Sequence, residues 1–400
     1  MTVPTRTHLL PLAGIRIILA LYIVLFHTIK FVAVSEEIKT LFSFGFVATD
    51  AFFVLSGFVL TYAYSGKIAR SEFSHKKFII KRISKLYPLV IFSLFLFFPW
   101  AFLWADKPLE LGVLNYEPQM FDRIFVLLSN IFLLDAWNPL YMGINFPCWS
   151  ISALFFMYFC FPFICRRLIH FSKTGLVLML LSLLTVNILL EILPPILTSV
   201  PKEITANLVH RNPIFKLPLF VSGIIASILL SYKTRFQWES GSAWSAEVIT
   251  TILISFIYFM HIQGYTVNRT YISPLLVLLV SSLSISTGIM STFITSRAVI
   301  KLSEISLSIF IIHIPLWRIF RIGYNYWNIF IQKMSILPTL NKFSRVDDVP
   351  PIFYLIYLIS LVFACNAIHA LIVTPVAERL NKKYLDSDNG AKRQLAAKRA

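Results

Sequence analysis

The sequence predicts an all-α, polytopic membrane protein with about ten transmembrane helices and one re-entrant or interfacial helix. Of its 400 residues, 57% are hydrophobic and only 14% are charged, and the mean hydropathy is +0.75. A soluble domain of this length would carry more charged residues and far fewer than 37 phenylalanines. The apolar residues also recur in runs near the roughly 20 residues that a helix needs to cross the hydrocarbon core.

Ten apolar segments are the candidate spans. They fall near residues 9–33, 41–64, 86–105, 148–165, 176–199, 214–232, 246–264, 273–292, 302–320 and 352–374. The first is expected to be a retained span and not a removed signal peptide, because no small-residue cleavage site follows it. A further apolar segment, 121–137, contains Asn130 and Asp135 and fits a re-entrant or interfacial element better than a lipid-facing helix.

Basic residues set the predicted orientation. The segment between the second and third spans contains Glu72 and seven cations, namely Lys67, Arg70, Lys76, Lys77, Lys81, Arg82 and Lys85. Loops rich in lysine and arginine stay in the cytoplasm. If the segment 121–137 enters the membrane and returns to the side from which it came, the chain crosses the membrane ten times. Both termini and the other basic loops then lie in the cytoplasm. In a bacterium, the chain would lie in the inner membrane.

The composition excludes several other classes. The formal net charge of +17 does not indicate nucleic-acid binding, because the basic residues lie in short segments between apolar runs. The four cysteines form neither a CxxC nor a Cys/His spacing, so no metal site or disulfide framework is predicted. We expect residues 1–380 to form one transmembrane domain and residues 381–400 a polar, disordered cytoplasmic tail.

Three ionisable residues lie inside the first two predicted spans, where such groups are costly unless they have a partner or a function. Arg16 and His27 are eleven residues apart, so they share one helix face about 16 Å apart along the axis. The topology puts Arg16 in the inner half and His27 in the outer half, with Asp50 near the level of His27. We therefore predict a His27–Asp50 pair in which the carboxylate fixes the imidazole tautomer, the alternative being a structural hydrogen bond.

Two further cations lie at the cytoplasmic end of the third span. Arg82 and Lys85 are three residues apart and share a helix face. Such residues commonly anchor a helix at the interface. Together with Arg16 they would instead form a cationic mouth for a phosphorylated ligand.

The remaining candidate residues would line a substrate groove. Gly57 lies seven residues after Asp50 on the same face, and Ser56–Gly57 would admit a thin substrate chain. Trp149 and Ser150 open the fourth span at the outer level, where a tryptophan is also a common interface anchor. His313 is a second buried imidazole, with a functional and a structural role equally open.

These segments resemble the integral-membrane acyltransferase 3 family, in order and over most of the chain. Asp50–Phe58 is close to the family's DLFFVLSGF signature, which is the most specific match. The other matches are Gly14–Arg16 with Phe26–His27 to the opening arginine-to-histidine motif, Phe78–Pro88 to FxxxRxxRxYP with Lys85 for the second arginine, Trp149–Pro162 to WSLSVExxFYLLFP, and 302–315 to LGEISYSLYLLHFP. Two acidic residues of the family pattern are missing, because Leu154 and Leu219 occupy their positions.

The resemblance implies an O-acyltransferase that moves an acyl group, most commonly acetyl, from cytoplasmic acyl-CoA to a hydroxyl of an extracytoplasmic glycan or related acceptor. Acyl-CoA would be a co-substrate and no cofactor would be bound. The expected partners are acyl-CoA, the acceptor and the lipid bilayer, without nucleic acid. Arg16, Arg82 and Lys85 would hold the CoA phosphates, while His27, oriented by Asp50, would act as general base or carry the acyl group covalently.

Two other functions stay open on the sequence. The buried charges also suit a transporter or channel for a small polar or acyl-bearing substrate. The leucines at 154 and 219 also suit a catalytically degenerate family member.

Overall fold

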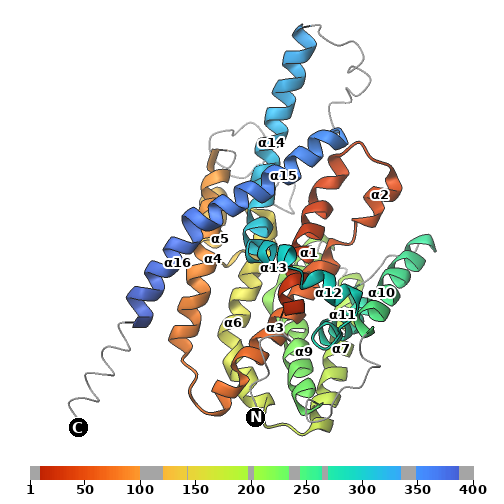
Figure 1. The fold of residues 1–400 in the computed structure, drawn as a ribbon, viewed down its shortest axis with the longest axis vertical. Helices are drawn as coiled ribbons and strands as arrows, with labels where there is room; N and C mark the ends of the chain where they lie inside the picture. Colours follow the sequence, from red (N-terminus) through yellow and green to blue (C-terminus); the bar gives the residue numbers. More distant parts are fainter. Residues whose placement is uncertain are drawn as a thin grey trace.

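The computed structural model describes residues 10–99, 120–141, 143–196, 202–233, 244–263, 269–334 and 348–386. Within these residues the chain is helical throughout, and the β-structure consists of an isolated bridge between Val32 and Val349. Figure 1 shows the helices gathered into one bundle, with the end of α14 extending beyond it. The predicted all-α architecture is confirmed.

Ten long helices lie where the spans were predicted. They are α1 (Leu10–Thr28), α3 (Gly45–Ala69), α4 (His75–Phe98), α6 (Trp149–Leu168), α7 (Lys173–Ile196), α9 (Pro213–Lys233), α10 (Ser245–Ile262), α11 (Arg269–Leu283), α14 (Ser306–Met334) and α15 (Pro351–Ile368). Six shorter helices join them, namely α2 (Glu36–Leu41), α5 (Met120–Ile131), α8 (Lys202–Arg211), α12 (Ile289–Ile294), α13 (Arg297–Glu304) and α16 (Thr374–Asn381).

Eight helices in the described ranges are long and apolar enough to cross a membrane. The two predicted spans that fall short do so for different reasons. Helix α4 carries Lys81, Arg82 and Lys85 within its length, so its first half is cationic. Helix α11 has 15 residues, which reach about 22 Å against a hydrocarbon core of roughly 30 Å. All ten predicted helices are present, and eight of them meet these criteria within the described residues.

Helix α3 is central to the bundle and packs against α1, α6, α9 and α11. Its contact with α9 is made backbone to backbone. A Cβ atom added to Gly57 would collide with the Phe220 carbonyl, and one added to Gly223 would collide with the Val54 carbonyl. Since lipid offers no hydrophobic drive between helices, small residues that allow such close approach hold membrane helices together.

The segment 121–137 forms α5 and a 3-10 turn, η4 (Asp135–Trp137). With 12 residues, α5 reaches about 18 Å, which is too short to cross a bilayer. The chain reverses at Leu133, whose φ is 55°, and a second 3-10 turn, η5 (Phe146–Cys148), leads into α6. The segment lies at the side of the bundle, where α5 packs against α4 and η4 packs against α6, and the outer side chains of α5 are exposed.

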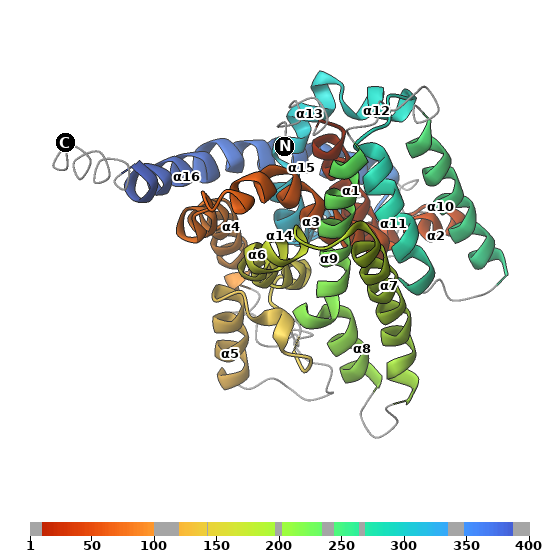
Figure 2. The same cartoon turned by 90° about the horizontal axis from the view of Figure 1, so that it is seen from below.

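The C-terminal helices α15 and α16 form one long diagonal rod across the bundle and away from it, as Figures 1 and 2 show. Helix α16 packs against α4 and continues through a π-helical turn, Lys382–Asp386. The first residues of the segment 381–400, predicted to be disordered, are thus helical. Residues 387–400 lie outside the described residues.

Candidate active site

Two imidazole rings face each other between α1 and α14. The Nδ1 atom of His27 lies 3.1 Å from Nε2 of His313, and the ring centroids are 5.2 Å apart. His313 is fully buried, whereas His27 is half-buried and lies edge-on to the Phe146 ring. His313, the histidine of the family pattern in 302–315, therefore lies against His27, the histidine of the first motif.

The hydrogen bonds of this pair fix both tautomers. Nδ1 of His313 lies 2.7 Å from the carbonyl oxygen of Phe310, which can only accept, so Nδ1 carries the hydrogen. In the neutral ring, Nε2 of His313 then has a lone pair and accepts from Nδ1–H of His27. The remaining nitrogen of His27, Nε2, keeps its lone pair directed away from His313. This is the arrangement that a general base requires.

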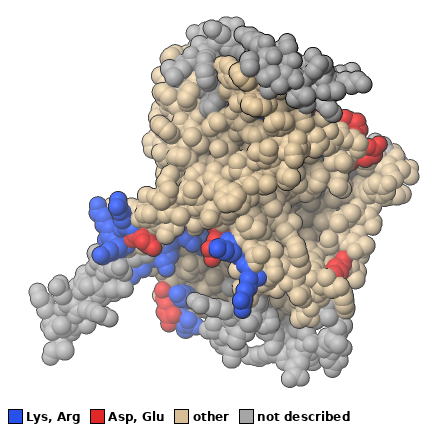
Figure 3. Space-filling model, turned by 45° about the horizontal axis from the view of Figure 1, so that its top comes forward, with Lys and Arg blue, Asp and Glu red and all other residues tan. Residues whose placement is uncertain are grey.

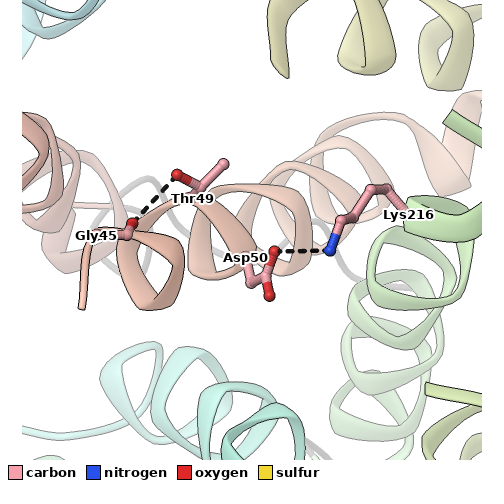
Figure 4. A network of polar contacts seen from close by, with 4 residues as sticks. All are labelled: Gly45, Thr49, Asp50 and Lys216. Carbon is pink, nitrogen blue, oxygen red and sulfur yellow. Dashed lines mark hydrogen bonds and ion pairs between the residues drawn. The ribbon is translucent and has the colours of Figure 1, made fainter. Parts of the chain in front are cut away.

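Asp50 lies beside Lys216, a partner that the predicted His27–Asp50 pair did not include. Its Oδ1 atom lies 3.4 Å from Nζ of Lys216 in α9, and both side chains are buried (Figure 4). Asp50 lies on the face of α3 that packs against α9, so its carboxylate meets a cation there. The partner that holds the His27 ring is His313.

Lys216 was not among the predicted site residues, although its position in the sequence indicated a buried cation. This lysine stands near the start of the predicted span 214–232, where a cation is costly without a partner. The same reasoning that selected Asp50 would have selected it. Removing one partner of a buried ion pair strongly destabilises the fold, because the other charge is left uncompensated.

A cavity of about 190 Å³ lies between α1, α3, α4, α6 and α14. Three cations line it, Arg16, Arg82 and Lys85, and none of its described lining residues is acidic. The guanidinium carbon of Arg82 stacks 5.1 Å from the ring centroid of Tyr158. The hydroxyl-bearing side chains of the lining are Thr49, Ser56, Ser150, Tyr158 and Ser306. The structure thus brings the three predicted cations together with Ser56 and Ser150.

Two other predicted groove residues lie elsewhere. Gly57 is packed against α9, because it shares the helix face of Asp50, and it does not line the cavity. Trp149 is buried against Phe53, with ring centroids 6.2 Å apart, and serves the packing of α6 on α3. The groove prediction is therefore corrected for Gly57 and Trp149.

Phe310 joins the cavity to the imidazole pair. Its side chain lines the cavity and its carbonyl oxygen accepts from His313 one helical turn later. The two leucines that replace acidic residues of the family pattern also lie at these sites. Leu154 lines the cavity with Arg16 and Arg82, whereas Leu219 is buried beside Asp50 and Lys216.

Metal-ligating side chains do not gather in groups of three or more within the part of the chain that the structure describes.

The fold and this site define a multi-pass membrane protein that encloses an imidazole pair beside a cation-lined cavity. The sequence model of one protein family, described as an acyltransferase domain, matches residues 12–370. This chain belongs to that family, the acyltransferase 3 family.

Two curated proteins are similar over shorter stretches. Acyltransferase MdmB of Streptomyces mycarofaciens is 31% identical over 121 residues, which cover 30% of this chain and 28% of that protein. Protein 2 in the picA locus of Rhizobium radiobacter is 36% identical over 83 residues, which cover 21% of this chain and 40% of that protein. The chain thus spans less than half the length of each of these relatives. No solved structure matches significantly.

Proposed function

We propose that this protein is a membrane O-acyltransferase. It takes an acyl group, in the simplest case acetyl, from acyl-CoA on the cytoplasmic side and transfers it to a hydroxyl of an extracytoplasmic glycan or related acceptor. The observation that carries the proposal is the His27–His313 pair, whose hydrogen bonds leave one imidazole nitrogen free to accept a proton. The family, with its acyltransferase relative, supports the reaction class.

The cation-lined cavity is the proposed donor site. Arg16, Arg82 and Lys85 offer three positive charges to the phosphates of CoA, and the described lining residues include no carboxylate that would compete. The rest of the lining is largely apolar and aromatic, as suits a pantetheine arm. Phe310 then brings the thioester end toward His313 and His27.

The orientation is part of the proposal. Lysine and arginine gather at one end of the face seen in Figure 3, beside a broad surface without charged side chains. A cationic end facing the cytoplasm agrees with the positive-inside rule and places the cavity mouth where acyl-CoA is made. The half-buried imidazole of His27 then lies nearer the opposite side.

The proposed reaction is a single displacement at the thioester. Nε2 of His27 takes the proton of the acceptor hydroxyl while the oxygen attacks the thioester carbonyl. The C–S bond breaks, the ester forms, and the CoA sulfur leaves and takes up the proton from His27. His313 accepts the hydrogen bond from Nδ1–H of His27 throughout, which holds the ring and favours its charged form in the transition state. A covalent acyl-histidine is a variant with the same residues.

Replacing the base tests the function. We expect His27→Ala, purified and inserted in liposomes with labelled acetyl-CoA, to lower acyl transfer by roughly 100-fold or more, the usual contribution of a general base. His170→Ala, an exposed histidine after α6, is the matched control and should retain full activity. Retained transfer by the His27 variant would overturn the role of this residue. Uptake of substrate by the wild type without acyl-CoA consumption would instead identify a transporter.

A further inference from the structure

A second group of buried polar side chains lies at the end of α5, in the segment between α5 and α6, and at the end of α8. We call Asn130, Asp135, Asn145 and Arg211 the polar cluster. Their exposed fractions are 2%, 4%, 0% and 5%, so none of them has free access to bulk water. Figure 2 shows α5 and α8 on the same side of the bundle, next to α6.

Six polar atoms of this cluster have no hydrogen-bond partner among the described residues. They are both carboxylate oxygens of Asp135, the Oδ1 atoms of Asn130 and Asn145, and Nε and Nη2 of Arg211. Buried polar groups in native proteins are nearly always paired, with protein, water or a ligand. Four acceptors and two donors left open in one place therefore indicate that something polar completes them.

Two of these side chains pack against the backbone of the same residue. A Cβ atom added to Gly143 would lie 2.9 Å from Oδ1 of Asn130 and 3.0 Å from Oδ2 of Asp135, so both groups converge on the bare glycine backbone. Asp135 and Arg211 are near enough for their charges to interact, yet they form no direct ion pair in the described chain. Burial raises the pKa of Asp135 to about 7, against the opposing effect of the Arg211 charge.

Asn145 links the polar cluster to the imidazole pair. Its Nδ2 atom donates to the Ile311 carbonyl of α14 at 2.7 Å, two residues before His313. The next residue, Phe146, lies edge-on to the His27 ring, with centroids 5.8 Å apart. The cluster therefore adjoins the His27 end of the site, and the cations of the cavity lie at the other end.

We propose that the polar cluster binds the acceptor, as a hydroxyl-rich sugar or related polyol, and presents one of its hydroxyls to Nε2 of His27. This inference rests on the proposed function and adds the place where the acceptor binds. Neighbouring sugar hydroxyls donate and accept at once, which matches a site with four open acceptors and two open donors. An apolar acceptor would leave all six atoms unpaired. Charge-assisted bonds to Asp135 and Arg211 would be the strongest contacts.

The test measures polyol binding without turnover. Methyl glucopyranoside, methyl galactopyranoside, methyl mannopyranoside and glycerol serve as probes for the purified full-length protein in nanodiscs, with saturation-transfer NMR as the readout. We expect at least one glycoside to bind the wild type. Asp135→Asn, which keeps the side-chain shape, and Asn130→Ala should weaken its binding by about tenfold, the worth of one or two good hydrogen bonds.

The matched control is Asn187→Ala, which removes a buried amide of α7 near Asp50 and should leave probe binding unchanged. Size-exclusion elution shows whether each variant is folded, and Asp135→Asn serves if Asn130→Ala is not. Binding of no probe by the wild type, or equal binding by wild type and Asp135→Asn, would overturn the inference. If probe binding depends on Asp135 while acetyl-CoA is never consumed, the polyol site stands and the acyltransferase proposal fails.

Discussion

At the residue scale, the two imidazoles that we propose as base and orienting group come from distant parts of the chain. His27 and His313 are 286 residues apart in sequence and share one hydrogen bond. The Phe310 carbonyl fixes the first proton of this relay, and the Tyr357 hydroxyl donates to the His313 carbonyl at 2.9 Å. His313 is thus a positioning residue, because it acts on the substrate only through His27.

The first prediction concerns His313. Its replacement by Ala should lower kcat for acyl transfer about 100-fold and leave KM for acetyl-CoA unchanged, because only the tautomer and aim of His27 are lost. His313→Gln should recover part of kcat, since its side-chain oxygen can still accept from Nδ1–H of His27. Steady-state kinetics in liposomes measure both. A loss of protein fold with no recovery by Gln would argue for a purely structural role.

The second prediction concerns Leu154, which occupies the position of a family glutamate. Leu154→Glu should raise KM for acetyl-CoA about tenfold, because the new carboxylate would pair with Arg16 or Arg82 and compete with the CoA phosphates. Leu154→Gln, which has nearly the same shape without the charge, is the control. If the wild type is inactive and Leu154→Glu gains activity, this chain is a degenerate member of its family.

At the element scale, the contact between α3 and α9 determines how the site is built. Gly57 and Gly223 let the two backbones touch, and the Asp50–Lys216 pair lies along the same contact. The opposite face of α3, with Thr49 and Ser56, is then free to line the cavity. A helix with its small residues on one side and its hydroxyl-bearing residues on the other thus separates packing from binding.

The third prediction tests this contact with two alanines. Gly57→Ala should lower stability by about 1–3 kcal/mol, because its methyl group would meet the Phe220 backbone, which cannot move aside. Gly323→Ala in α14 is the matched control, since nothing lies within 4 Å of its added Cβ atom. Thermal unfolding in detergent, followed by size-exclusion, compares them. Equal midpoints for the two variants would contradict the close contact.

At the scale of the whole molecule, the described surface combines a cationic end with broad apolar flanks, as a multi-pass membrane protein requires (Figure 3). Helix α4 does not meet the composition expected of a membrane-spanning helix, because it contains the three cations Lys81, Arg82 and Lys85. Arg82 and Lys85 line the cavity, however, whereas Lys81 is exposed in the first half of the helix, next to the basic loop. A helix of this kind can cross a membrane with its cations sheltered.

The fourth prediction follows from that placement of α4. Single cysteines at Glu72, before α4, and at Leu140, after α5, should lie on opposite sides of the membrane in a cysteine-free background. A membrane-impermeant maleimide applied to whole cells should then label Leu140→Cys and leave Glu72→Cys unlabelled until the cells are lysed. Labelling of both positions on one side would show that α4 does not cross, and labelling of Glu72→Cys alone would reverse the proposed orientation of the donor site.

Much of this protein follows from its sequence alone. The ten long helices lie at the apolar runs, because a helix satisfies its backbone hydrogen bonds locally and membrane burial selects apolar residues over its length. The motifs also located the cations that meet in one cavity, since Arg16 lies in α1 and both Arg82 and Lys85 lie in α4. The sequence did not determine which neighbouring helix each helix face contacts. Helical spacing placed Asp50 and Gly57 on one face, but only the tertiary structure turned that face toward α9.

The same limit explains the pairing at the centre of the site. Sequence neighbours favoured Asp50 as the partner of His27, whereas the fold supplies His313 from α14 and gives Asp50 to Lys216. Arg211 likewise joins Asp135 only because α8 packs against the turn that follows α5. Local hydrogen bonding and apolar composition determine where a helix forms. The packing of residues distant in sequence decides which polar groups come into contact, and the chemistry of this protein depends on those contacts.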